Sequence, residues 1–344
     1  MRTFVTVLVI LICCAVVLPT EATAQKKLAQ TGMKFLNILP DARAIALGEA
    51  FTAVQGTSSS MFFNTAAMSR LKGLATVHLT RTNWIADINY VSGSAAFKPF
   101  EGEYGVIGVM FQVSNYGDFE ETVRWPNDRG YLDLGTFEPT SYMFGVGYAR
   151  ALNDKFSVGG NIKYVHQSLG EAMTALGTGG GLLYDESGNL VRASNSTGVY
   201  AFDFGILYET GYKSLTFGMS VRNFSKEVTY VKEGFQLPLT FRIGLAMNVL
   251  DLTDLNPNEH QFLVSMDAEH PRDFDEQIRI GAEYLFMKIV ALRAGYVSGG
   301  DEYAGFYGVG LQKDLAGVGL AVDYSYTPFG IFTNVHRFSF QFSM

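Results

Sequence analysis

The side chains best suited to catalysis or metal binding are scattered along this chain. Its five histidines are His78, His166, His260, His270 and His336. None stands in the His-Glu-x-x-His spacing that places two zinc ligands on one helical face. No Gly-x-Ser-x-Gly segment marks a nucleophile elbow, although a serine, a histidine and an acid far apart in sequence could still assemble in space. We therefore predict no catalytic residue, no metal site and no bound cofactor.

The N-terminus has the order of features that is typical of a secretory signal peptide. Arg2 precedes the apolar run Phe4–Leu18, and the small residues Ala22–Ala24 follow it. The run is shorter than the roughly 20 residues that a spanning helix needs. We predict a signal peptide over residues 1–24, with cleavage before Gln25.

Both cysteines, Cys13 and Cys14, lie inside this predicted signal peptide. The mature chain would then hold no disulfide, no thiolate zinc site and no cysteine nucleophile. The charge is mildly acidic, with 33 Asp+Glu against 26 Lys+Arg, and no basic stripe points to nucleic acid. An exported chain of this kind must be stabilised by its fold alone.

Apolar residues alternate with polar or small ones along most of the remaining chain. Phe156–His166, Ser214–Asn223 and Val318–Tyr326 show this period of two, and Arg337–Met344 continues it to the last residue. One face of a transmembrane strand meets lipid and the other meets the lumen. Strands in lipid must close on themselves, because every backbone N–H and C=O needs a partner there. The alternation predicts an all-β membrane protein, an antiparallel transmembrane β-barrel over residues 74–344.

We expect about fourteen strands, an even number as in bacterial single-chain barrels. Most even-numbered connections are short, and the long ones near 116–139, 168–198 and 225–238 would be extracellular. The expected strands are residues 74–82, 87–97, 104–115, 140–151, 155–167, 199–210, 213–224, 239–249, 260–269, 276–286, 289–297, 304–312, 318–326 and 335–344.

Residues 25–73 do not follow the strand pattern. Asp41–Phe51 is rich in helix formers and small residues, and Met61–Met68 follows after the break at Ser58–Ser60. Their apolar side chains need a place to be buried, and a barrel of about fourteen strands leaves a lumen wider than its own side chains fill. We predict a small helical plug inside the lumen.

The same N-terminal segment resembles the opening of the PorV/PorQ outer-membrane proteins. The resemblance lies in Met33–Ile38, Asp41–Phe51 and Phe62–Met68, where Thr65 and Ala67 replace the proline and glycine usual in that family. It implies a FadL-like barrel in the outer membrane of a Gram-negative bacterium. It also implies a non-catalytic role in type IX protein secretion, with a translocon, attachment-complex proteins or the C-terminal signal domains of secreted cargo as partners.

Extracellular aromatics would suit such protein partners, and the candidates are Tyr116, Phe119 and Trp125. The alternative is that these three belong to the aromatic girdle at the membrane interface.

The second functional hypothesis is FadL-like transport of fatty acids or other hydrophobic small molecules. Asp41, Arg43, Asn64, Thr65 and Ala66 would then be plug or gate residues. Alternatively, the two charged members only satisfy each other or the lumenal strand residues Arg222, Arg279 and Glu283. A wide apolar opening would favour transport, and a sealed lumen would count against it.

Overall fold

The computed structural model describes residues 31–173, 184–230, 233–299, 304–332 and 334–344. The predicted signal peptide lies outside the described residues and stays a prediction. No helix within them is long and apolar enough to cross a membrane.

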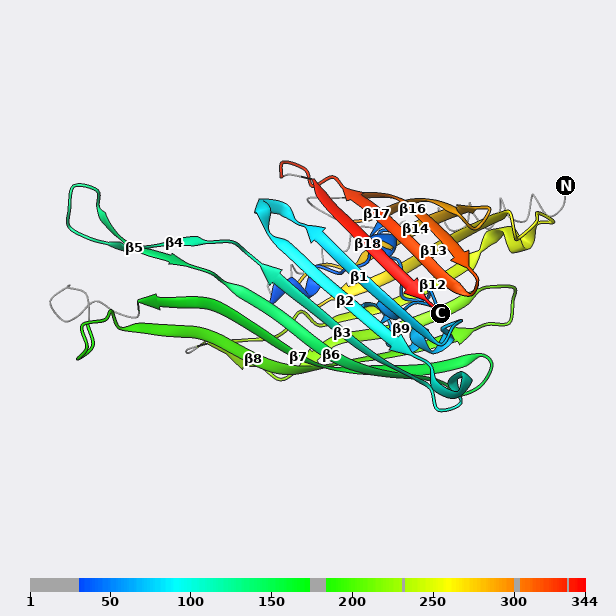
Figure 1. Cartoon of the computed structure of the whole chain (residues 1–344), viewed down its shortest axis with the longest axis horizontal. Helices are drawn as coiled ribbons and strands as arrows, with labels where there is room; N and C mark the ends of the chain where they lie inside the picture. The colour runs from blue at the N-terminus through cyan, green and yellow to red at the C-terminus, as the bar shows by residue number, and fades with distance from the viewer. Residues whose placement is uncertain (1–30, 174–183, 231–232, 300–303, 333) are drawn as a thin grey trace.

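Fourteen strands of the described chain form one closed antiparallel barrel (Figure 1), which confirms the predicted fold class. Each strand pairs with the next in sequence around the wall, and β1 closes the ring by pairing with β18. The barrel strands are β1 (Ala75–Asn83), β2 (Asn89–Phe97), β3 (Val106–Asn115), β6 (Thr140–Ala151), β7 (Phe156–Met173), β8 (Arg192–Glu209), β9 (Thr216–Ser225), β12 (Thr240–Asn248), β13 (His260–Pro271), β14 (Gln277–Phe286), β15 (Val290–Val297), β16 (Gly305–Leu315), β17 (Val318–Thr327) and β18 (Val335–Ser343).

The two faces of the wall differ as the alternation predicts. On β1, Leu79 is 51% exposed while its neighbours His78 and Thr80 are buried. Its register partner on β18 is Phe340, which is 64% exposed. Apolar side chains therefore cover the outside of the barrel, where they would meet lipid, and polar side chains line the lumen.

Two hairpins in the long connections were not predicted as strands. They are β4 (Phe119–Arg124) with β5 (Tyr131–Phe137), and β10 (Val228–Thr229) with β11 (Gly234–Phe235). β7 and β8 also run past their predicted ends, and Figure 1 shows β4, β5 and the far ends of β7 and β8 projecting well beyond the rest of the barrel. Alternation marks a strand only where one face meets lipid, so strand segments beyond the membrane lose that signal.

The described chain before β1, residues 31–74, packs inside the lumen, as predicted for a plug. Its helical pieces are η1 (Lys34–Asn37), α2 (Ala42–Ala46), η2 (Ser58–Phe62) and η3 (Thr65–Arg70). Isolated helices this short are unstable, so their stability must come from burial, and one hydrophobic cluster joins their side chains to those of the wall. Three further turns, η4 (Ile85–Asp87), η5 (Pro99–Gly102) and η6 (Val249–Leu252), lie in the connections between strands.

Glycines on the lumenal face let the plug backbone approach the wall closely. A Cβ added to Gly159 would lie 2.7 Å from the backbone nitrogen of Ala66. A Cβ added to Gly281 would lie 2.7 Å from the Cβ of Leu47. Strand glycines often mark such a close backbone approach, so these positions shape the wall to fit the plug.

Candidate functional site: the plugged lumen

The described plug runs from one end of the barrel to the other. At the end with the long connections, Thr31 Oγ1 donates to Asp273 Oδ2 at 2.8 Å, and Lys34 forms an ion pair with the same carboxylate. At the end with the short turns, Arg70 Nη2 donates to the carbonyl oxygen of Asp154 at 2.8 Å. Long connections are extracellular in bacterial barrels, so the plug enters β1 from the periplasmic side.

Asp41 organises the start of α2. Its backbone has a φ of 84°, and its carboxylate accepts hydrogen bonds from the backbone N–H groups of Arg43 at 2.8 Å and Ala44 at 3.2 Å. Carboxylates at this position satisfy the free N–H groups of a first helical turn. The hydroxyl of Ser59 donates to the other oxygen of Asp41, which links α2 to η2.

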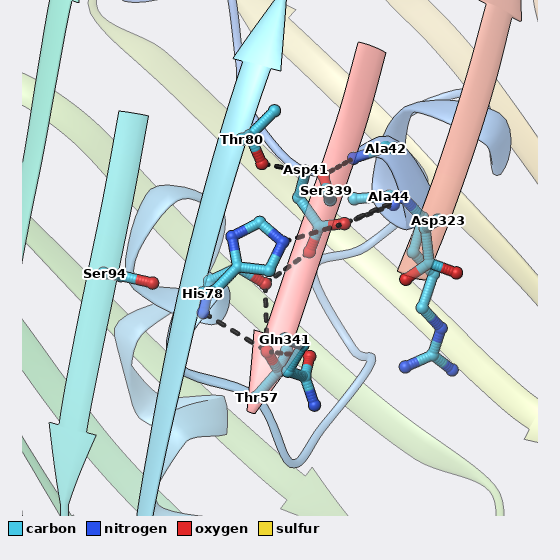
Figure 2. Close-up of polar contacts among 12 residues, drawn as sticks. Asp41, Ala42, Ala44, Thr57, His78, Thr80, Ser94, Asp323, Ser339 and Gln341 are labelled. Atoms are coloured by element: carbon cyan, nitrogen blue, oxygen red, sulfur yellow. Dashed lines mark hydrogen bonds and ion pairs between the residues drawn. The ribbon is translucent and has the colours of Figure 1, made fainter. Parts of the chain in front are cut away.

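His78 points from β1 into the same cluster, toward Asp41 (Figure 2). Its Nε2 lies 3.7 Å from Asp41 Oδ1, and neither ring nitrogen has a hydrogen-bond partner among the described residues. A serine nucleophile would need a hydrogen bond to the histidine, whereas Ser59 donates to Asp41 directly. The cluster therefore does not have the geometry of a catalytic triad.

Arg43 is held by the wall rather than by the Asp41 side chain. Its Nε and Nη2 donate to the two oxygens of Glu283 at 2.8 and 2.7 Å. Arg293 donates to Glu283 at 2.5 Å and to Asp323 at 2.6 Å. Two-point arginine–carboxylate bonds fix orientation as well as distance, so this chain of charges clamps α2 against β14, β15 and β17.

A second charged cluster holds the end of the α2 region. Arg242 Nη2 donates to Glu49 and Glu269, both at 2.9 Å. Arg279 donates to Glu269 at 2.5 Å and lies 3.2 Å from Glu49. Nearby, Asp267 accepts hydrogen bonds from plug residues 51 and 52. The plug is thus fastened by paired charges at Arg43 and Glu49 and by hydrogen bonds at residues 51 and 52.

Asn64 forms a third anchor, nearer the periplasmic end. Its Nδ2 donates to the carbonyl oxygens of Thr52 at 2.8 Å and Ile206 at 2.9 Å, and its Oδ1 accepts from Ala66 N–H at 3.1 Å. Thr65 and Ala66 are buried against the wall. The five plug or gate candidates therefore do not meet in one site, because Asp41 and Arg43 bind one set of strands and Asn64–Ala66 another.

A small compartment lies between the plug and the wall, and we call it the methionine compartment. It encloses a cavity of about 10 Å³, which is room for about one water molecule. Five polar wall residues also line it, namely Gln112, Lys163, Asp203, Arg222 and Asn223. Lys163 lies 2.8 Å from Asp203, and Arg222 donates to the carbonyl oxygen of Phe62 at 2.8 Å. Its apolar lining consists of Leu36, Leu39, Met61 and Phe62 from the plug and Met110 and Met143 from the wall.

The extracellular candidates are likewise separated. The hydroxyl of Tyr116 lies 3.3 Å from that of Ser141 at the rim of the barrel. Phe119 begins β4 and pairs with Phe137 at a ring distance of 5.8 Å, while Trp125 follows the far end of β4. The structure does not gather these aromatics into one patch.

Several residues of the plug–wall contacts were not found from the sequence. His78 and Asp267 carry no motif, and their plug partners, Asp41 and residues 51 and 52, lie far away in the chain. The only sequence signal for such contacts was a charged residue at a lumenal position of a predicted strand. This signal identified Glu283, which binds Arg43 of the plug. No group of three metal-binding side chains comes together in the described parts of the chain.

Comparison with known proteins supports the fold and goes no further. No protein-family model matches the chain, and no curated sequence does. Among solved structures, the toluene transporter TodX of Pseudomonas putida aligns with a TM-score of 0.53 and 13% identity, over 87% of this chain and 96% of its own. CymD, a monoaromatic hydrocarbon channel, aligns with a TM-score of 0.57 and 12% identity, over 93% of this chain and 99% of its own. At such low identity the likeness shows a shared barrel architecture.

Proposed function

We propose that this chain is a non-catalytic outer-membrane channel for small hydrophobic molecules, with a plug that must shift to let them pass. The methionine compartment carries the proposal. Methionine side chains are flexible and polarizable, so a wall made of them can re-form around apolar guests of different shape. The compartment is too small for a guest while the plug is seated, because it has room for about one water molecule.

The architecture agrees with such a role. TodX and CymD, which share the barrel fold, are described as a toluene transporter and a monoaromatic hydrocarbon channel. We extend that ligand class, small apolar molecules, to this chain. Fatty acids and other lipids belong to the same proposal, and passage would begin with movement of the plug that is packed against the wall.

Two methionine substitutions test the proposal. Met143→Ala enlarges the methionine compartment, and Met266→Ala makes the same change on the outer face, where Met266 is exposed. Uptake of labelled toluene and naphthalene would be measured in cells that carry each variant in the outer membrane. We expect Met143→Ala to favour naphthalene by about tenfold, the order of one pocket-filling group, and Met266→Ala to behave as wild type. Equal uptake ratios in all three proteins would refute the compartment as part of the path.

The second candidate is the type IX secretion role implied by the sequence resemblance. One observation favours it: Arg192 of β8 forms an ion pair with Glu121 of β4 and donates to the carbonyl oxygen of Leu134 at 3.3 Å. These bonds join the two projecting hairpins into one built extension, which a channel for small molecules does not require.

The two candidates separate in a pull-down from the native outer membrane. A variant in which a short turn replaces residues 118–138 removes β4 and β5 and leaves every barrel strand intact. If the secretion role is correct, the full chain retains a translocon or exported proteins with a common C-terminal domain, and the shortened chain loses them. A barrel that retains only lipid or apolar ligands in both forms would leave transport as the function.

A further inference from the structure

An arginine interrupts the apolar outer face of β1. Val77 and Leu79 point outward from this strand and are 39% and 51% exposed, and Arg81 is the next residue on the same face. Asp87 in η4, the acidic residue nearest in sequence, forms no ion pair with it, and Arg81 has no hydrogen-bond partner among the described residues. A charge on the lipid-facing side of a barrel wall is destabilising to a degree that depends on its depth in the bilayer. The surroundings of this guanidinium must therefore compensate its charge.

The level of Arg81 in the membrane follows from the strand register. Arg81 pairs with Phe338 of β18, which pairs in turn with Tyr324 of β17, and these two rings pack at a centroid distance of 5.0 Å. Outward-facing aromatic residues form girdles at the membrane interfaces of such barrels. β1 also ends shortly after Arg81, with Asn83, at the extracellular end of the wall. Arg81 therefore lies at the level of the lipid headgroups of the outer leaflet.

The wall around Arg81 offers hydrogen-bond donors and no outward negative charge. In the row just beyond it toward the extracellular side, Asn83 pairs with Asn89 of β2 and with His336 of β18. The five neighbouring strands β17, β18, β1, β2 and β3 hold a single acidic residue, Asp323. That residue is buried on the lumenal face. The strands therefore leave the positive charge of Arg81 open to an anion from outside the protein.

We propose that the outer face around Arg81 binds the phosphate group of a lipid in the outer leaflet. A guanidinium group presents its N–H donors in a fork that matches two phosphate oxygens, and the side-chain amide of Asn83 has two further N–H donors. The acyl chains of the same lipid would lie along the exposed side chains of Leu79 and Val77, on the same face of β1. The site lies outside the barrel, so it does not depend on which molecule passes through the lumen.

Native mass spectrometry of the protein released from detergent micelles tests the site without any transport measurement. The affinities for dioleoyl phosphatidic acid and for dioleoylglycerol would be compared, because these two lipids differ only in the phosphate group. We expect the wild-type protein to prefer phosphatidic acid. Arg81→Gln should weaken binding of phosphatidic acid by about tenfold, the size of one hydrogen bond to a charged group, and leave binding of dioleoylglycerol unchanged.

Arg124→Gln is the matched control, because Arg124 is an exposed arginine on β4, outside the barrel wall, and its loss should not change either affinity. Arg81→Leu is a second variant that suits a lipid-facing position and replaces the first if that one does not fold. Equal affinity of the wild type and the Arg81 variants for phosphatidic acid would overturn the proposal, as would a wild type that binds both lipids alike. A mass of two barrels that disappears in the Arg81 variants would assign this face to self-association and overturn it as well.

Discussion

A disulfide between residues 58 and 94 would fasten the plug to the barrel wall. Ser94 on β2 donates its hydroxyl hydrogen to Ser58 Oγ in η2 at 3.0 Å. Two sulfur atoms in these places need to approach only to the 2.05 Å bond length of a disulfide. The predicted mature chain has no other cysteine, so Ser58→Cys with Ser94→Cys allows a single bridge.

The effect follows from the position of the two residues, which are 36 apart in sequence. Chain-entropy arguments give about 4 kcal/mol for a loop of that size. A free energy of this size lowers the population of molecules in which η2 has left the wall by on the order of a thousandfold, relative to the protein without the bridge. η2 carries Met61 and Phe62, which line the methionine compartment, so a fixed η2 keeps the compartment closed. Cells that carry the oxidised protein should therefore take up labelled toluene no faster than cells that lack the protein. A reducing agent should restore uptake.

A bridge within the wall provides the control. Thr80 and Ser339 are register partners on β1 and β18, and their hydroxyl oxygens lie 2.7 Å apart. Thr80→Cys with Ser339→Cys joins two strands and leaves η2 free, so uptake should persist under oxidation. If the bridge from plug to wall, confirmed by mass spectrometry, leaves toluene uptake unchanged, displacement of η2 is not part of the path.

Three further predictions concern the plug and one outer turn. Asp267→Ala removes the acceptor of three hydrogen bonds from two plug residues, one of them Thr52. At about 1 kcal/mol for each bond, we expect the amide hydrogen exchange rate at residues 50–54 to rise about hundredfold. An unchanged exchange rate would contradict the role of Asp267 as an anchor. Gly159→Val places side-chain atoms where the plug backbone lies, so the yield of heat-resistant folded barrel should fall, and a normal yield would show that the plug can shift there at little cost. The backbone N–H of Asn189 holds the pKa of Asp185 below its usual range. The turn from Asp185 to Asn189 should therefore persist above about pH 4 and open as the pH falls through the lowered pKa of Asp185. The NMR chemical shifts of Asp185 and Asn189, measured against pH, would follow this opening.

The barrel could be predicted from the sequence because lipid imposes a pattern on every strand. Phe338, Phe340 and Phe342 each point outward from β18, and the spacing alone places them there. The plug was predicted from the absence of that pattern. The contact between His78 and Asp41 could not be predicted, since it depends on how a segment without regular periodicity folds back inside a closed ring.

The candidate residues show the same difference in more detail. Arg43 was expected to pair either with Asp41 or with a lumenal strand residue, and its partner is Glu283. The sequence predicts that lumenal charges pair, because an unpaired buried charge is costly. It does not predict which ones, because the choice depends on the register of β14 against the plug.

The unequal fastening of the plug indicates which part of it moves. The Asp41–Thr52 stretch is held by two clusters of paired charges, and removing one member of a buried pair is strongly unfavourable. The segments around the methionine compartment are held by hydrogen bonds between wall side chains and plug carbonyl groups: Gln112 to Ile38 at 2.8 Å, and Arg222 to Phe62 at 2.8 Å. Such bonds can be exchanged for water at little net cost. Passage should therefore open beside η1 and η2 while α2 stays clamped, and a plug that left the barrel as a whole would contradict this view of the lumen.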